Sequence, residues 1–235
     1  MPRIILVGGG SSSGKSYVTD KVIKNVGIDK VTKITIDDYY KDQSLVSMED
    51  RVKQNYDHPK AFDWKLMRKQ IADLKEGISI DKPVYDFTIH NRTDKVEKIV
   101  PKELVIVEGI MALVDKQLRD IAHLKVFISA SPEVRFLRRF IRDHAERKRS
   151  YEAIVSQYLK TVAPMYEEII APSSNYADLI VNNDDGVANA SIEVLTCVFK
   201  NELLMATDGK DHTYHANNEF TEELLDRVFD DSVKN

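Results

Sequence analysis

The feature that most constrains this chain is a glycine- and serine-rich octapeptide near its N-terminus. Gly9-Gly10-Ser11-Ser12-Ser13-Gly14-Lys15-Ser16 matches the pattern G-x-x-x-x-G-K-[ST] at every fixed position. An apolar run precedes it and a helical pattern follows it, which is the context that this pattern requires. Backbone N–H groups in such a turn form an anion site at a helix N-terminus. The sequence therefore predicts a phosphate-binding loop, with Lys15 at the outer phosphates and the Ser16 hydroxyl in the shell of a Mg²⁺ ion.

Short apolar runs alternate with longer helical patterns along the rest of the chain. The predicted strands are Arg3–Val7, Lys33–Ile36, Leu104–Val107, Lys125–Ser129 and Asp178–Val181, and the predicted helices are Lys15–Val26, Trp64–Lys75, Pro132–Glu146 and Tyr151–Ile170. Strands that are apolar through most of their length are typical of a parallel sheet buried on both faces. We therefore expect an α/β fold, a P-loop NTPase-type three-layer sandwich with a five-stranded, mostly parallel sheet.

Composition and charge are those of an ordinary globular protein. The 235 residues are 43% hydrophobic and 31% charged, which is enough for one large core. Residues 201–235 carry nine acidic and three basic side chains, so the net charge of −4 leaves +2 for residues 1–200. We expect one domain over 1–200, with a polar insertion at about 41–101, and an acidic tail over 201–235.

Cysteine usage and hydropathy bear on the compartment and the partners. A single cysteine, Cys197, excludes an intrachain disulfide and favours a reducing compartment. The apolar stretches are too short to span a bilayer. The net charge gives no sign of a nucleic-acid or membrane coat. We therefore expect a cytoplasmic protein without nucleic-acid or membrane partners.

Acidic residues follow two of the predicted strands. Asp37 and Asp38 come directly after the second strand, and Glu108 comes directly after the third. Acids at the carboxyl ends of parallel strands face the ligand crevice of an open sheet. One of the paired acids could accept a proton from a hydroxyl that attacks a γ-phosphate, and Glu108 could hold Mg²⁺. The alternatives are a helix cap at the first position and a solvated turn acid at both.

A basic helix follows the fourth predicted strand. Four arginines recur at i, i+3, i+4 and i+7 and therefore share one helix face: Arg135, Arg138, Arg139 and Arg142. In a nucleotide-using enzyme, such a stripe clamps the transferring phosphates. The alternatives are a solvated basic face and a nucleic-acid surface, and no aromatic platform or repeat supports the second of these.

Seven segments of the chain, taken in order, form a recognisable set. They are the loop at 9–16, Asp37-Asp38-Tyr39-Tyr40-Lys41, Asn55-Tyr56-Asp57-His58-Pro59, Pro83-Val84-Tyr85-Asp86-Phe87-Thr88-Ile89-His90-Asn91-Arg92, Glu108-Gly109-Ile110, Arg138-Arg139-Phe140-Ile141-Arg142-Asp143 and Gln157-Tyr158. Together they resemble the uridine kinases (uridine–cytidine kinases) of the phosphoribulokinase/uridine kinase family of P-loop kinases. The resemblance runs from Ile4 to Val181, roughly three-quarters of the chain.

The resemblance implies transfer of the γ-phosphate of ATP or GTP to the 5′-hydroxyl of uridine or cytidine, with Mg²⁺, by a homotetramer. By position, Asp37 would be the general base beside Lys15, and Ser16, Asp37 and Glu108 would surround the metal. The nucleotide would be bound by Gly9, Gly10, Ser11, Ser12, Ser13, Gly14, Lys15, Ser16, Tyr17, Arg139 and Arg142. The nucleoside would be bound by Asp57 at the ribose, by Tyr40, Tyr85, Phe87 and His90 at the base, and by Arg142, Arg149 and Gln157. Residues 135–160 would form a lid that includes Arg147 and Arg149.

The sequence departs from the family pattern at three places. Lys148 stands where a Glu-Arg-Gly-Arg lid segment usually has glycine, Ala163 replaces a basic residue before Pro164, and the acidic tail has no counterpart. Two other functions stay open. One is a related P-loop kinase for a sugar phosphate or a pantothenate-like alcohol, and the other is a nucleotide-binding regulator without turnover.

Overall fold

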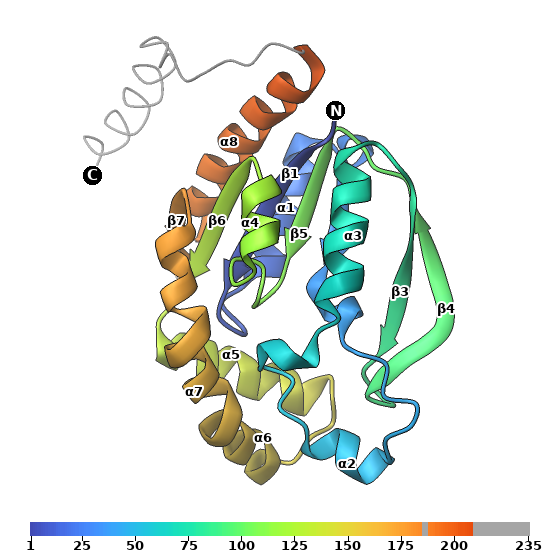
Figure 1. The fold of residues 1–235 in the computed structure, drawn as a ribbon. Helices are drawn as coiled ribbons and strands as arrows, with labels where there is room; N and C mark the ends of the chain where they lie inside the picture. The colour runs from blue at the N-terminus through green and yellow to red at the C-terminus, as the bar shows by residue number, and fades with distance from the viewer. Residues whose placement is uncertain (185–187, 209–235) are drawn as a thin grey trace, which may run out of the picture.

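The computed structural model describes residues 1–184 and 188–208, and its centre is a parallel sheet between two helical layers (Figure 1). Across the sheet the strands are β2 (Val31–Thr35), β5 (Leu104–Glu108), β1 (Arg3–Gly9), β6 (Leu124–Ser129) and β7 (Leu179–Asn182). Every neighbouring pair is parallel. The predicted α/β sandwich is confirmed, and each predicted strand ends within two residues of the observed one.

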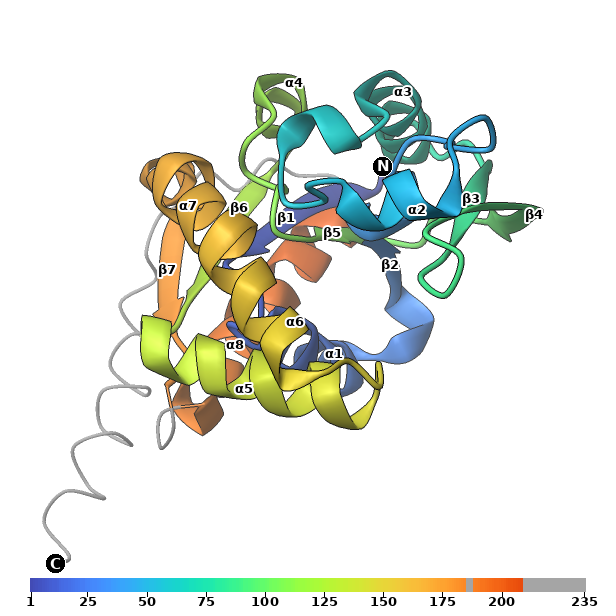
Figure 2. The ribbon, with the colours of Figure 1, turned by 90° about the horizontal axis from the view of Figure 1, so that it is seen from below.

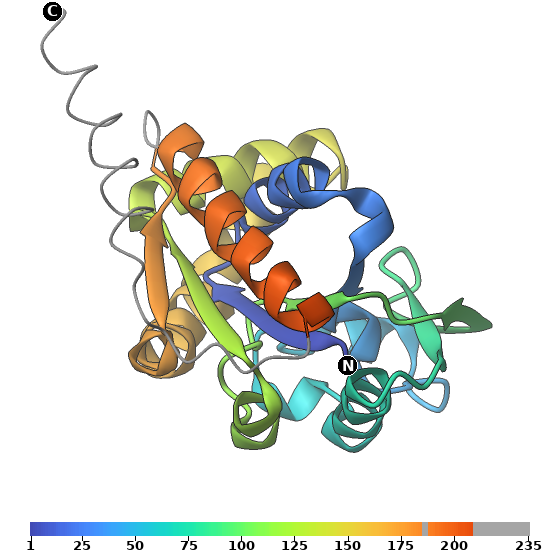
Figure 3. The same cartoon turned by 90° about the horizontal axis from the view of Figure 1, so that it is seen from above.

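Two helices cover each face of the sheet, as the views from below and from above show (Figures 2 and 3). α1 (Lys15–Val26) and α8 (Ala188–Asp208) lie on one face, and α3 (Trp64–Lys75) and α4 (Lys116–Ile121) lie on the other. The side chains of β1 alternate between the two cores. Ile4 and Leu6 pack with the buried residues of α3, whereas Ile5 and Val7 pack with those of α1 and α8. This alternation explains why the central strands are apolar throughout.

α8 corrects the predicted boundary between domain and tail. The helix continues to Asp208, past the boundary expected at residue 200. Leu195 and Phe199 are buried in the core, and Glu202 Oε2 accepts a hydrogen bond from Arg3 Nε at 2.6 Å. The first residues of the expected tail are therefore anchored to β1, and residues 209–235 lie outside the described residues. No helix of the described residues is long and apolar enough to cross a bilayer.

The segment at 41–101 is more than an insertion at the edge of the sheet. Its helix α3 covers one sheet face, while a hairpin of β3 (Ile80–Asp86) and β4 (Asn91–Ile99) lies to the side of the sheet and α2 (Met48–Lys53) lies below it (Figure 1). Asn91 pairs with Asp86 and Arg92 pairs with Tyr85, so the turn lies before Asn91. Asn91 and Arg92 therefore belong to β4 and not to the turn.

The predicted lid is a helical hairpin at the carboxyl end of the sheet (Figure 2). α5 (Pro132–Ala145) is followed by α6 (Tyr151–Gln157), which continues through α7 (Ala163–Met165) with a π-helical turn on either side of it. A proline inside a helix usually kinks or splits it, because it has no N–H and its ring clashes with the preceding turn. Instead, the wider turns accommodate the missing N–H of Pro164, and the backbone stays helical.

Candidate functional site

The phosphate loop is shaped by close backbone approaches. A Cβ at Gly9 would lie 2.3 Å from the carbonyl oxygen of Ile128, and a Cβ at Gly14 would lie 2.0 Å from Asn183 Nδ2. Both glycines have positive φ angles, 144° and 86°. Asn183 Nδ2 donates to the Ser13 carbonyl oxygen at 2.8 Å, so the residue that follows β7 braces the loop from behind. Glycine is therefore required at both positions.

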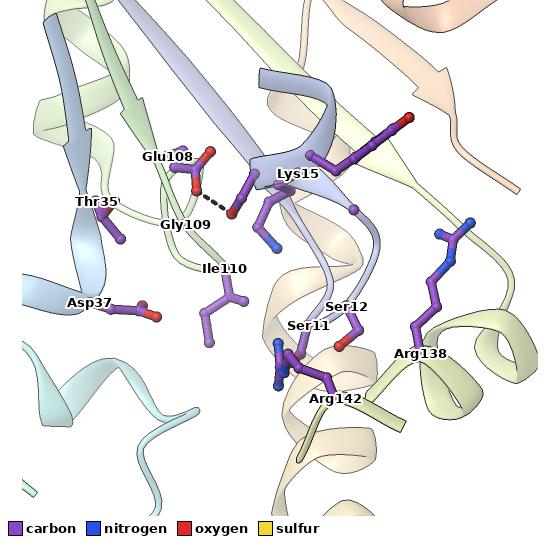
Figure 4. A pocket seen from close by; sticks show the side chains of 13 residues that line it. Ser11, Ser12, Lys15, Thr35, Asp37, Glu108, Gly109, Ile110, Arg138 and Arg142 are labelled. Carbon is purple, nitrogen blue, oxygen red and sulfur yellow. Dashed lines mark hydrogen bonds between the residues drawn. The ribbon is translucent and has the colours of Figure 1, made fainter. Parts of the chain in front are cut away.

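The loop opens onto a cavity of about 350 Å³ (Figure 4). Its lining comes from the loop, from the ends of β2 and β5 and from α5: Ser11, Ser12, Gly14, Lys15, Ser16, Tyr17, Thr35, Asp37, Glu108, Gly109, Ile110, Arg138 and Arg142. Lys15 lies between Asp37 on one side and Arg138 on the other (Figure 4). Its Nζ donates to the Gly10 carbonyl oxygen at 2.7 Å, and burial lowers its pKa to about 8. Lys15 is thus still mainly protonated at neutral pH and can neutralise phosphate charge.

Sheet register brings Glu108 beside the loop. Glu108 is level with Val7 of β1 and with Thr35 of β2. Ser16 Oγ donates to Glu108 Oε1 at 2.5 Å, while the buried Glu108 Oε2 accepts no hydrogen bond and has Lys33 Nζ at 3.4 Å. One hydroxyl and one carboxylate with an unused oxygen therefore meet next to the expected phosphate position.

Asp37 follows β2 in a short 3₁₀ turn and faces the same cavity. Burial and the neighbouring carboxylate of Asp57 raise its pKa to about 6, although the charge of Lys15 opposes this shift. A carboxylate with a pKa near neutrality is suited to accepting a proton at physiological pH.

The three oxygen-bearing side chains fit a Mg²⁺ ion. Mg²⁺ prefers oxygen ligands and keeps several positions for water and phosphate. Ser16, Asp37 and Glu108 supply a hydroxyl and two carboxylates. Glu108 Oε2 is buried and accepts no hydrogen bond, with Lys33 Nζ 3.4 Å away, and this is the observation that favours a cation here. No cluster of three His, Cys, Asp or Glu side chains suited to a metal occurs among the described residues, so phosphate oxygens would have to complete the shell.

The basic face of α5 turns toward the phosphate loop. Arg138 and Arg142 line the cavity, and Arg139 Nη1 donates to Ser11 Oγ at 2.7 Å. Arg135 is only 2% exposed and lies against Gly10. The alternative of a solvated basic face does not hold, because all four arginines face the loop or the cavity.

The aromatic residues predicted at the nucleoside form a cluster beside the cavity and are not among the residues that line it. The Tyr40 ring lies 4.5 Å from the ring of Phe62, 5.0 Å from that of Tyr85 and 5.2 Å from that of Tyr56. Burial raises the pKa of the Tyr40 hydroxyl well above its usual value, and the charges of Asp37 and Asp57 raise it further. The cluster therefore adjoins both acids.

Asp57 is 7% exposed and links this cluster to the lid. Burial raises the pKa of its carboxyl, while the guanidinium groups of Arg139 and Arg142 lower it. A buried acid without an ion pair of its own, near both Asp37 and the arginines, is placed to hold sugar hydroxyls.

The remaining predicted residues surround the cluster at the lid side. The Tyr85 ring lies 5.1 Å from that of Phe87, and the guanidinium of Arg147 lies 5.5 Å from the Phe87 ring. The His90 ring lies 5.5 Å from that of Tyr56. Gln157 Oε1 accepts from Arg139 Nη2 at 3.0 Å and from Arg149 Nη1 at 2.5 Å. The sequence-predicted residues thus form two adjoining groups, one at the cavity and one between the hairpin and the lid.

Sequence reasoning missed three residues of this region. Tyr56 and Asp143 lie inside the recognised segments, and their positions beside an aromatic cluster and an arginine stripe were the signals that could have found them. Asn183 gave no local signal, because its contact with Ser13 depends on the packing of β7 beside β6.

Comparison with known proteins agrees with this geometry. The model of the phosphoribulokinase/uridine kinase family matches residues 4–188. A uridine kinase of Clostridium perfringens is 42% identical over 205 residues, 86% of this chain and 98% of that protein. A uridine kinase of Streptococcus agalactiae serotype V is 45% identical over 188 residues, 80% of this chain and 89% of that protein. The solved phosphoribulokinase from Rhodobacter spheroides shares the fold, with a TM-score of 0.57 at 16% identity over 77% of this chain and 70% of its own. The chain belongs to the phosphoribulokinase/uridine kinase family.

Proposed function

We propose that this chain is a uridine kinase that transfers the γ-phosphoryl group of ATP or GTP to the 5′-hydroxyl of uridine or cytidine, giving UMP or CMP. Relatives with that name, 42–45% identical over most of the chain, support the nucleoside as acceptor. The observation that carries the proposal is Asp37, which lines the cavity with Lys15 and feels the charges of both Lys15 and Asp57.

Asp37 acts as the general base. Its carboxylate accepts the proton of the 5′-hydroxyl as that oxygen forms its bond to the γ-phosphorus, and the bond between the γ-phosphorus and the bridging oxygen of the nucleoside diphosphate breaks. Asp37 lines the same cavity as Lys15, on the side of that lysine away from Arg138 (Figure 4).

The phosphate side stabilises the charge that moves to the leaving group. The loop N–H groups and Lys15 hold the phosphate oxygens, and the arginines of α5 approach from the lid. Ser16, Glu108 and Asp37 would hold Mg²⁺, which, when bound, offsets charge on the phosphate oxygens.

The hairpin side is better suited to an uncharged acceptor than to a sugar phosphate. Lys82 is already paired with Asp38 and with Glu97, the second at 3.3 Å. Arg92 is paired with Asp63 at 3.3 Å. Since these basic groups are neutralised, the buried aromatic cluster would meet a nucleoside base rather than an anion.

The proposal is tested by following ADP release with Mg-ATP and identifying the product by mass. The acceptor panel contains uridine, cytidine, 2′-deoxyuridine, adenosine, pantothenate and ribulose 5-phosphate. Turnover confined to uridine and cytidine supports the proposal, and turnover of ribulose 5-phosphate or pantothenate would contradict it. If ATP binds but no acceptor is phosphorylated, the regulator hypothesis is favoured instead.

Asp37→Asn is the matched variant for the same assay. The amide keeps the size of the side chain but cannot accept the proton, so turnover should fall by about 10³-fold while ATP still binds. A turnover number like that of the wild type would remove Asp37 from the mechanism.

A further inference from the structure

One buried acid lies among the arginines of the lid. The side chain of Asp143 has no exposed surface, although it belongs to a helix at the edge of the molecule. Guanidinium groups surround it: Arg139 Nε lies 3.4 Å and Arg149 Nη1 3.7 Å from Oδ2, while Arg142 Nη2 lies 2.7 Å and Arg147 Nη1 3.6 Å from Oδ1. One negative charge therefore faces four positive charges.

The two oxygens of this carboxylate are used differently. Oδ1 accepts two hydrogen bonds from Arg142, at 2.9 Å from Nε and 2.7 Å from Nη2. Oδ2 is buried and accepts no hydrogen bond. The distances to Arg139, Arg147 and Arg149 exceed the length of a hydrogen bond. Asp143 thus accepts two hydrogen bonds from one arginine, Arg142, and attracts the other three by charge without hydrogen-bonding them.

The backbone returns the lid loop to the same residue. The Arg149 N–H donates to the Asp143 carbonyl oxygen at 3.2 Å, and Lys148, with a φ angle of 55°, makes the turn that allows it. Arg139 bonds both Ser11 of the phosphate loop and Gln157 of α6. Contacts therefore run from Asp143, through Arg139, to the phosphate loop and to the second lid helix.

We propose that Asp143 is a positioning residue, which fixes Arg142 at the phosphate cavity and gathers Arg139, Arg147 and Arg149 by its charge without hydrogen-bonding them. Arg147 can turn to phosphate oxygens at the cost of an ion-pair contact alone, whereas Arg139 and Arg149 would also exchange their hydrogen bonds to Ser11 or Gln157. The remaining charge of the group, +3, attracts a polyphosphate before any of the arginines moves. This inference rests on the proposed kinase activity and names the residue that prepares the lid for it.

Asp143→Asn tests the inference, because the amide has the same size but no charge. Without the acid, the arginines lose their orientation but the lid gains positive charge. We expect the Kd for Mg-ATP, measured by titration calorimetry, to stay equal or to fall by up to about fivefold. The kcat with uridine should fall by about tenfold or more, because the arginines no longer converge on the transferring group. Glu133→Gln is the control, since Glu133 is exposed on α5 but lies outside the lid segment 135–160, and both constants should stay within about twofold of the wild type.

Asp143→Glu is the rescue variant. It keeps the negative charge, so its kcat should lie between those of the wild type and Asp143→Asn. The inference is overturned if Asp143→Asn keeps a kcat within about twofold of the wild type. It is also overturned if that variant binds Mg-ATP much more weakly and melts at a much lower temperature, which would indicate that the acid only supports the fold.

The two parts of the experiment separate this inference from the proposed function. The nucleotide titration needs no acceptor, so the comparison of Asp143→Asn with Glu133→Gln decides whether the acid controls the charge of the lid. A wild-type protein that binds Mg-ATP but does not phosphorylate uridine contradicts the proposed function alone.

Discussion

The cavity at the phosphate loop and the aromatic cluster beside it are the proposed phosphate side and nucleoside side of this site, and they are built in different ways. The phosphate side comes from eight consecutive residues and two strand ends, which the register of the parallel sheet holds in place. The nucleoside side comes from side chains of separate segments, such as Tyr40, Asp57 and Tyr85, which are held by contacts with one another and with the lid. The first depends on backbone geometry, whereas the second depends on many shared side-chain contacts. Single substitutions should therefore have abrupt effects on the phosphate side and graded effects on the nucleoside side.

Lys15→Met should have the largest effect. It removes the one lysine of the loop while keeping the length of the side chain, so transition-state charge on the transferred group loses its nearest buried cation. We expect the kcat for UMP formation, measured by quantifying the product by mass, to fall by about 10³-fold. Lys24→Met, on the exposed face of the same helix, is the control and should leave kcat unchanged. A fall in kcat of less than tenfold for Lys15→Met would contradict the expectation that single substitutions on the phosphate side have large effects.

Asp57→Asn should have a smaller effect that is specific to the acceptor. The amide keeps the size of the side chain but has no charge, so its hydrogen bonds to the sugar hydroxyls are weaker. We therefore expect kcat/KM for uridine to fall by about 10²-fold, while the KM for ATP changes little. The preference for uridine over 2′-deoxyuridine should shrink at the same time. Steady-state kinetics with both nucleosides provides the measurement, and Asp94→Asn, exposed on the hairpin, is the matched control. An equal rise in the KM values for uridine and for ATP would show that Asp57 does not bind the sugar.

Asp37→Asn should also change stability, and in a pH-dependent way. Burial raises the pKa of Asp37 from 3.8 to about 6, so the folded protein favours the protonated form. The stability penalty of the charged carboxylate is absent at pH 4, grows as the pH rises through 6, and is complete above it. With a chelator present and without nucleotide, the Asp37→Asn variant should therefore be more stable than the wild type by about 3 kcal/mol at pH 7.5 and by little at pH 4. Urea unfolding at both pH values is the measurement, and an equal gain at both would show that the charge is not the cause.

The phosphate side and the sheet were predictable because their signals are local. The loop at 9–16 has a fixed spacing, and Asp37 and Glu108 follow apolar strands whose parallel pairing brings their ends together. The arginine stripe was predictable for the same reason, since the helical period places four arginines on one face.

The rest depends on contacts between distant residues, which the local sequence does not encode. Asp143 is the acid at the centre of the arginines only because the lid loop folds back through Lys148. Asn183 braces the loop only because β7 pairs with β6. The end of α8 is anchored by Glu202 and Arg3, which are far apart in the sequence, so the expected boundary at residue 200 fell inside a helix.

Lys148→Gly should have the smallest effect and should sharpen the comparison on the nucleoside side. Lys148 has a φ angle of 55°, in the left-handed region where a Cβ is disfavoured, and its Nζ donates to the Ala145 carbonyl oxygen at 2.7 Å. Glycine relieves the backbone strain, worth about 1 kcal/mol, and loses only an exposed hydrogen bond.

We therefore expect Lys148→Gly to raise the melting temperature by about 3 °C and to change kcat by less than about threefold. Lys148→Ala is the matched control. It loses the same hydrogen bond but keeps the Cβ in the left-handed region, so its melting temperature should be no higher than that of the wild type. If Lys148→Gly is less stable than Lys148→Ala, the hydrogen bond from Nζ matters more than the backbone strain. The lysine would then be a stabilising part of the turn that returns Arg149 to Asp143, rather than a strained substitute for glycine.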